Sequence, residues 1–183
     1  IAKYEGNYDG GYKPTRKARV AKLKSLGLLH DHWDVVPQIG NWESVKLKEW
    51  ESACMEVYAA MVDNMDQGIG RIVEALEGAG QLDNTLILYL SDNGIAFPGA
   101  KTNLYEPGMR LPLVVRAPAQ KKRGGSTSAM VSWTDLTPTI LSFAGATPKN
   151  YKFHGRSFLG ALDQESPKGW DEVYASHTFH EVT

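Results

Sequence analysis

The residues that could most clearly bind a ligand or take part in a reaction lie between positions 86 and 112. There an apolar run ends in Asp92-Asn93-Gly94, and Lys101 follows. Asp92 and Asn93 offer one anionic and one neutral oxygen ligand, which suits a hard cation such as Ca²⁺ or Mg²⁺ better than zinc. A lysine close to a cation site is expected where an anion lies between the two, since both then stabilise its charge. The spacing indicates a site for a sulfate or phosphoryl group. The alternative is an ordinary turn, because Asp-Asn-Gly is common in turns.

The elements around this stretch are expected to alternate between helices and strands. Residues 50–76 carry apolar side chains every three or four positions, which predicts one long amphipathic helix packed on a sheet. The strands predicted at 86–90 and 111–118 are apolar on both faces, as in parallel sheets covered by helices. We therefore expect an α/β fold with a mostly parallel (mixed) sheet flanked by helices. Ligands of such sheets bind beyond the carboxyl ends of strands, where Asp92 and Asn93 stand.

Three further elements are predicted outside this region. A short basic amphipathic helix is expected over 15–26, because apolar residues recur there at helical spacing among lysines and arginines. A third strand that leads into a helix is expected within 128–146, with Thr134 as the helix N-cap. A last strand is expected over 172–177.

The composition limits the classes of function. The 183 residues are enough for one domain with a core, and the net charge of −1 provides no bulk attraction for nucleic acid or an anionic membrane. No run approaches the roughly 18 apolar residues of a membrane span. The single cysteine excludes an internal disulfide. We accordingly expect neither a nucleic-acid partner nor a membrane partner, while the oligomeric state stays open.

Three motifs resemble the sulfatases of the alkaline-phosphatase superfamily and occur in the family's order. They are LDNTLILYLSDNG at 82–94, GAKTNLYEPGMRLPLVV at 99–115 and WTDLTPTILSFAG at 133–145. Residues 57–76 resemble the helix that precedes the metal strand of that family. The resemblance implies a partial sulfatase domain over 1–183, in which 1–147 belong to the main sheet and its helices and 148–183 begin a C-terminal subdomain.

The resemblance also implies roles for individual residues. Asp92 and Asn93 match two ligands of a single divalent cation, usually Ca²⁺ and less often Mg²⁺. Lys101 matches the catalytic lysine that contacts the substrate sulfate. Glu106 and Arg110 match residues that support this loop, and we expect them to form an ion pair.

Two branches of the family are visible in the chain. The first ninety residues resemble bacterial arylsulfatases, whereas the short loop before Lys101 and the closing SHTFHEVT resemble the heparan N-sulfatase branch. This implies a sulfated small molecule or glycan as substrate, with N-sulfated or sugar sulfates favoured, and His177 and His180 at the border of the substrate pocket. A purely structural role is the alternative for both histidines. A periplasmic or extracellular location follows from the same resemblance.

The departures from the family pattern concern the nucleophile. Sulfatases use a formylglycine made from the first residue of a C/S-x-P-x-R motif, but Cys54 is followed by Met-Glu-Val-Tyr and no serine fits. We therefore expect a piece of a longer sulfatase that is inactive by itself, because half of an active site cannot replace a nucleophile. The alternatives are a phosphodiesterase or phosphomutase of the same superfamily, or a binding or structural module. Asp92 is followed by Asn and not by His, which favours a one-metal sulfatase.

Overall fold

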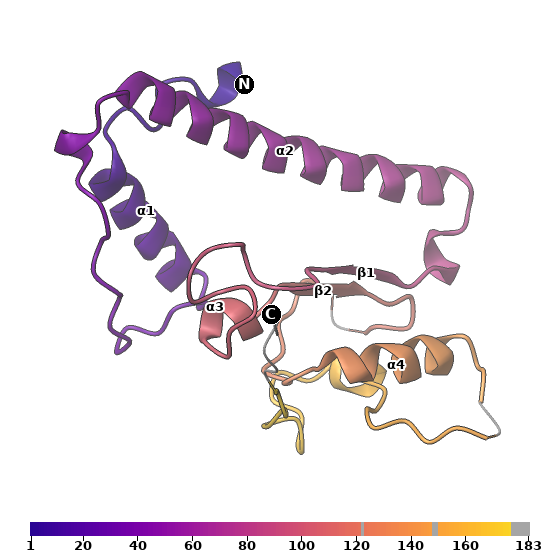
Figure 1. Cartoon of the computed structure of the whole chain (residues 1–183). Coiled ribbons are helices and arrows are strands. Elements are labelled where there is room, and N and C mark those ends of the chain that lie inside the picture. The colour runs from indigo at the N-terminus through magenta and orange to yellow at the C-terminus, as the bar shows by residue number, and fades with distance from the viewer. Residues whose placement is uncertain (122, 148–149, 177–183) are drawn as a thin grey trace, which may run out of the picture. The chain divides into compact units, whose positions relative to one another are not determined.

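The computed structural model describes residues 1–121, 123–147 and 150–176 (Figure 1). The chain divides into two compact units, Ile1–Leu76 and Glu77–Thr183. Each unit is treated by itself below. Among the described residues, no helix is both long enough and apolar enough to span a bilayer.

The first unit contains two helices, α1 and α2, and two 3-10 turns. Their bounds are Ala2–Tyr4 for η1, Tyr12–Ser25 for α1, Trp42–Ser44 for η2 and Lys48–Gly78 for α2, whose last two residues extend into the second unit. Both helices predicted in this part of the sequence are thus confirmed, with ends shifted by a few residues.

The N-terminal segment contacts α2 through polar side chains. The Ser52 hydroxyl donates a 2.6 Å hydrogen bond to the Asp9 carboxylate. The ammonium of Lys3 lies 3.0 Å from the Asp63 carboxylate, and this hydrogen bond raises the pKa of Lys3 and lowers the pKa of Asp63.

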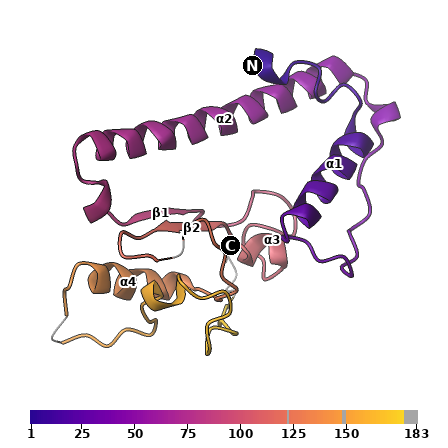
Figure 2. The same ribbon diagram turned by 180° about the vertical axis from the view of Figure 1, so that it is seen from behind.

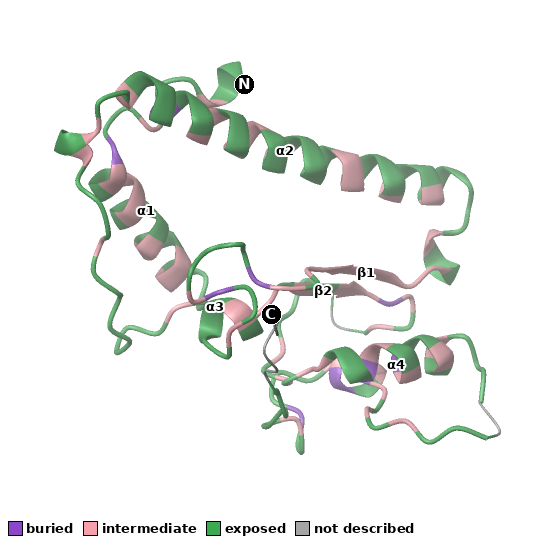
Figure 3. Ribbon diagram, viewed as in Figure 1, coloured by how far each residue is buried: buried purple, intermediate pink, exposed green. Residues whose placement is uncertain are grey.

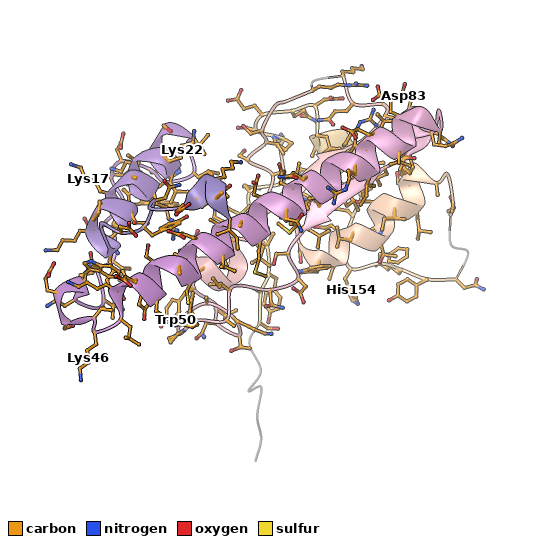
Figure 4. All side chains as sticks on the ribbon, turned by 90° about the horizontal axis from the view of Figure 1, so that it is seen from above. Lys17, Lys22, Lys46, Trp50, Asp83 and His154 are labelled. Carbon is orange, nitrogen blue, oxygen red and sulfur yellow. The ribbon has the colours of Figure 1, made fainter. Side chains whose placement is uncertain are left out.

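The apolar face of α2 is more exposed than its sequence predicts. Trp50 is 67% exposed and Met61 is 65% exposed, and most of the helix surface is exposed or only partly buried (Figures 3 and 4). Most of this helix belongs to the first unit, whereas both described strands belong to the second, so packing of this face on a sheet stays a prediction. The helix forms all the same, because the period of its apolar residues and its lack of proline are local properties.

The described residues of the second unit form two strands, two α-helices and three short 3-10 turns. Their bounds are Leu82–Asn84 for η3, Ile87–Leu90 for β1, Glu106–Met109 for α3, Leu113–Arg116 for β2, Trp133–Asp135 for η4, Leu136–Phe143 for α4 and Leu159–Ala161 for η5. β1 and β2 pair antiparallel, with Leu90 opposite Leu113. The α/β character is thus present, whereas the parallel arrangement expected for these two strands is wrong. The 22 residues from Ser91 to Pro112 return the chain through α3 to the same strand end, so β2 runs back along β1.

The strands predicted near residue 128 and near residue 172 are not formed in the described residues. Ser128 N–H donates to the carbonyl of Glu165 at 2.7 Å and Met130 N–H to the carbonyl of Trp170 at 2.8 Å. These bonds join the segment around 128–130 to the turn-rich segment 165–170, but they do not build a ladder, because their acceptors are five residues apart while the donors are two apart. The last position of the predicted strand at 172–177 lies outside the described residues.

Helix α4 begins differently from the prediction. Thr134 lies inside the 3-10 turn η4, and Ser132 is the N-cap of that turn. The backbone N–H of Ser132 donates a 2.8 Å hydrogen bond to the carboxylate of Asp135, which also accepts from the N–H of Arg156 at 2.8 Å. Asp135 is 7% exposed, so its two backbone donors satisfy a buried carboxylate and connect the start of α4 with a distant loop.

The core of the second unit gathers around Thr139 of α4, which is fully buried beside Phe158. The Thr139 hydroxyl donates to the carbonyl of Asp135 at 2.6 Å and accepts from the N–H of Phe158 at 3.1 Å.

We expect Thr139→Val to lower the free energy of unfolding by about 1–3 kcal/mol, because the shape is kept while a buried N–H loses its partner. Denaturant titration measures the change. The exposed Thr137 on the same helix serves as control, and Thr137→Val should change stability by less than about 0.5 kcal/mol. Equal effects at both positions would contradict the role of Thr139.

Candidate functional site

Strand β1 presents the predicted cation ligands at its carboxyl end. The pairing with β2 continues one residue beyond β1, since the N–H of Ser91 donates to the carbonyl of Pro112 at 3.4 Å. The Ser91 hydroxyl then donates to the carbonyl of Asn93 at 2.8 Å, which closes a tight turn around Asp92. The apolar sequence of β1 therefore ends in a constrained turn that places Asp92 and Asn93 directly after the strand.

The donor set at this turn fits a hard cation in kind but is small. Asp92 is exposed and Asn93 is half-buried, and no hydrogen bond or ion pair to the Asp92 carboxylate is found among the described residues. A carboxylate and an amide oxygen suit Ca²⁺, which takes about six to eight oxygen ligands. In the part of the chain that the structure describes, no three His, Cys, Asp or Glu side chains gather as a metal cluster. Most ligands of such an ion would therefore have to come from other residues or from water.

Lys101 lies on a compact loop that returns to the same turn. The carbonyl of Ile95 accepts hydrogen bonds from the N–H of Phe97 at 2.7 Å and from the N–H of Lys101 at 3.1 Å. Ala100 is only 2% exposed and anchors the loop, whereas Lys101 itself is exposed. The loop and α3 lie beside the end of the β1–β2 pair in both views (Figures 1 and 2). The structure therefore brings the backbone of Lys101 next to the turn that follows Asn93.

The predicted supporting pair is present on α3. Arg110 Nη1 lies 3.8 Å from Glu106 Oε2, one helical turn away. Both side chains are about half exposed or more, so this ion pair by itself contributes little stability, on the order of 0.5 kcal/mol. The expected ion pair is therefore present, while the supporting role of the two residues stays a prediction.

His177 and His180 lie outside the described residues, so their proposed place at the substrate pocket stays a prediction. Cys54 is exposed in the middle of α2, in agreement with its exclusion as the nucleophile.

A surface hollow away from the predicted site escaped the sequence analysis. Its volume is about 460 Å³, and it is lined by Thr134 of η4, Thr137 of α4 and the segment that contains Tyr151, Phe153 and His154. Figure 4 labels His154. The rings of Tyr151 and Phe153, which both line it, are tilted by 60° to one another with centroids 4.7 Å apart. The aromatic residues at 151 and 153 were the feature of the sequence that could have indicated this hollow. None of the predicted catalytic or cation-binding residues that the structure describes lines it.

A family model for sulfatases matches residues 2–146, and the chain belongs to the sulfatase family. Human N-sulphoglucosamine sulphohydrolase is 46% identical over 131 residues, which cover 67% of this chain and 26% of that protein. Among solved structures, BT4656 in complex with its substrate D-glucosamine-2-N,6-O-disulfate has a TM-score of 0.58 and 32% identity, with 84% of this chain and 29% of that chain covered.

A second solved structure belongs to a different enzyme class. The phosphonate monoester hydrolase from Silicibacter pomeroyi has a TM-score of 0.55 and 29% identity, with 72% of this chain and 27% of that chain covered. The chain spans about a quarter of the length of the human relative.

Proposed function

We propose that this chain forms the cation- and sulfate-binding wall of an active site that hydrolyses sulfate esters or sulfamates. The proposal depends mainly on one observation about the loop. The N–H of Lys101 donates a hydrogen bond to the carbonyl of Ile95, a residue that lies two positions after Asn93. This closure brings the backbone of Lys101 back to the turn that follows Asp92, and the side chains of both residues are exposed. The membership of the sulfatase family supports sulfate as the anion between them.

In this proposal each residue has one task. The carboxylate of Asp92 and the amide oxygen of Asn93 hold a divalent cation, for which Ca²⁺ is the preferred choice and Mg²⁺ the alternative. When bound, that cation offsets the negative charge of the sulfate group and polarises its sulfur–oxygen bonds. The ammonium of Lys101 donates hydrogen bonds to a sulfate oxygen and stabilises the charge that develops during cleavage. The Glu106–Arg110 pair joins the start of α3 to its C-cap, and we propose that it supports the loop in this way.

The nucleophile has to come from residues that this chain does not contain. No C/S-x-P-x-R sequence occurs in its 183 residues. The two ligands at Asp92 and Asn93 also complete only a small part of a cation's coordination. We therefore propose that the chain is inactive alone and acts as part of a larger sulfatase, with a periplasmic or extracellular location.

The proposed substrate is a glycan or sugar that carries an N-sulfate. N-sulphoglucosamine sulphohydrolase is the relative at 46% identity, and the substrate in the BT4656 structure carries a 2-N-sulfate and a 6-O-sulfate. The similarity to a phosphonate monoester hydrolase favours phosphoryl chemistry as the second candidate. Aryl sulfates are the third substrate to be tested.

A chimera tests this function. In it, the region of human N-sulphoglucosamine sulphohydrolase matched over 131 residues carries the residues of this chain. We expect release of sulfate from N-sulfoglucosamine, with weaker activity on an aryl sulfate and none on a phosphonate monoester, because the human remainder supplies the nucleophile and the other ligands. The 183-residue chain assayed alone should release no sulfate. A chimera that unfolds cooperatively and binds Ca²⁺, yet cleaves only the phosphonate, would contradict the proposal.

A further inference from the structure

The loop that carries Lys101 is held by two contacts in which backbone packs directly on backbone. A Cβ atom on Gly94 would lie 2.4 Å from the carbonyl oxygen of Pro107 and 3.1 Å from the backbone nitrogen of Lys101. A Cβ atom on Gly108 would lie 2.3 Å from the carbonyl oxygen of Ala100. Side chains do not tolerate such short distances, so only glycine permits either contact.

Both glycines are required by closeness and not by backbone conformation. Neither Gly94 nor Gly108 is among the residues with positive φ, whereas Thr102 has a φ of +64°. This left-handed conformation is disfavoured for a β-branched residue and persists only when the surroundings enforce it. Thr102 directly follows Lys101 and is exposed, so the enforcement comes from the backbone contacts on either side of the loop.

We propose that Gly94 and Gly108 are positioning residues for Lys101. Gly94 docks the turn after Asn93 on the backbone of Lys101, and Gly108 docks α3 on the residue before it. Together they fix the separation between the cation ligands and the ammonium-bearing residue, so that one sulfate group contacts the cation and Lys101 at once. The proposal rests on the proposed function and adds residues that touch neither substrate nor cation.

The measurable consequence is coupling between the two ligands. If one sulfate group contacts both partners, Ca²⁺ raises the affinity for sulfate, and sulfate raises the affinity for Ca²⁺ by the same factor. We expect a factor of about five or more in the unsubstituted chain, the lower end of usual coupling factors. If Lys101 is not held at a fixed distance from the cation, the coupling is lost, although Ca²⁺ and sulfate each keep their own contacts with the protein.

The test uses this chain within the chimera described above, labelled with ¹⁵N, because the human remainder supplies the other cation ligands. Ca²⁺ alone, inorganic sulfate alone and sulfate in the presence of Ca²⁺ are titrated, and the amide signals of Asp92, Asn93 and Lys101 report binding. Gly108→Ala should leave the Ca²⁺ response at Asp92 and Asn93 within about twofold, while the coupling factor falls to about one. Gly160→Ala is the matched control, since a Cβ atom there meets nothing within 4 Å, and it should retain the coupling.

A second pair of variants covers the case in which Gly108→Ala fails to fold. Thr102→Pro imposes a negative φ on the exposed apex of the loop and should also abolish the coupling. Thr102→Gly accepts the observed φ without strain and should keep the coupling within about twofold. If Thr102 had a merely structural role, the two variants Thr102→Pro and Thr102→Gly would change in thermal stability but would show the same coupling factor.

The outcomes separate the two proposals. Coupling that survives in Gly108→Ala or in Thr102→Pro overturns the positioning role and leaves the proposed function intact. An unsubstituted chain whose Asp92, Asn93 and Lys101 signals respond to neither Ca²⁺ nor sulfate overturns the proposed function, and the positioning role with it. Loss of coupling in these two variants, with retention in Gly160→Ala and Thr102→Gly, supports both.

Discussion

Replacing Asp92 with asparagine in the chimera is expected to weaken Ca²⁺ binding by more than about 100-fold and to remove measurable hydrolysis of N-sulfoglucosamine. Asparagine keeps the size and one oxygen of the side chain, so the substitution removes the negative charge and little else. Loss of a group that merely orients a ligand already costs about 10–100-fold in metal affinity. Loss of a direct anionic ligand should therefore cost more. Isothermal titration with Ca²⁺ and the initial rate of sulfate release measure the two effects.

The chain contains a matched control for this substitution. Asp83 precedes β1 and is followed by Asn84, so the same dipeptide stands at the opposite end of the strand. The Asp83 carboxylate lies 3.1 Å from Arg116 Nη2 and is largely exposed. Asp83→Asn should change Ca²⁺ affinity and activity by less than about twofold, because exposed ion pairs contribute little. Equal losses in Asp83→Asn and Asp92→Asn, or no loss in Asp92→Asn, would contradict the cation site.

Replacing Lys101 with methionine in the chimera is expected to lower kcat/KM about 10²–10³-fold while Ca²⁺ affinity in the absence of substrate stays within about threefold. The magnitude is that of removing one preorganised charge-stabilising donor from an active site. Methionine retains a long flexible side chain, so packing changes little while the ammonium is lost. Because Lys101 is exposed, the substitution should leave the melting temperature almost unchanged.

Two comparisons isolate the role of the ammonium. Lys101→Arg keeps the charge but replaces a compact ammonium with a wide planar guanidinium, so we expect only partial recovery of kcat/KM. Lys121→Met removes another exposed lysine from the loop after β2 and should leave kcat/KM within about twofold. A fall in Ca²⁺ affinity of Lys101→Met as large as its fall in kcat/KM would show that Lys101 supports the cation site and does not contact the sulfate.

The sequence predicted the elements whose cause is local. The helix α2 follows from apolar residues at a period of three to four, and β1 and β2 follow from short apolar runs bounded by turn residues. The ion pair of Glu106 and Arg110 was expected from the resemblance to the sulfatases, and it forms because residues four apart on a helix face one another. These features need no knowledge of distant segments.

Other features escaped prediction because they depend on partners far along the chain. An apolar strand does not encode whether its neighbour runs parallel or antiparallel, so the antiparallel pairing of β1 and β2 was missed. The N-cap was misplaced because Asp135 accepts from Ser132 and also from Arg156, which is 21 residues away. Among the described residues, the segment starting at 128 makes isolated bonds to residues 165, 166 and 170 and forms no strand.

The sequence by itself determined which residues follow β1 and what chemistry they can offer. The types and order of Asp92, Asn93 and Lys101 indicated an anion between a cation and a lysine, since residue type alone decides charge and ligand preference. Only the tertiary structure decided how Lys101 is held. Its loop closes through the hydrogen bond to Ile95, and the approach of α3 depends on the missing side chain of Gly108. That approach joins backbone atoms of separate segments, which no periodicity or composition along the chain records.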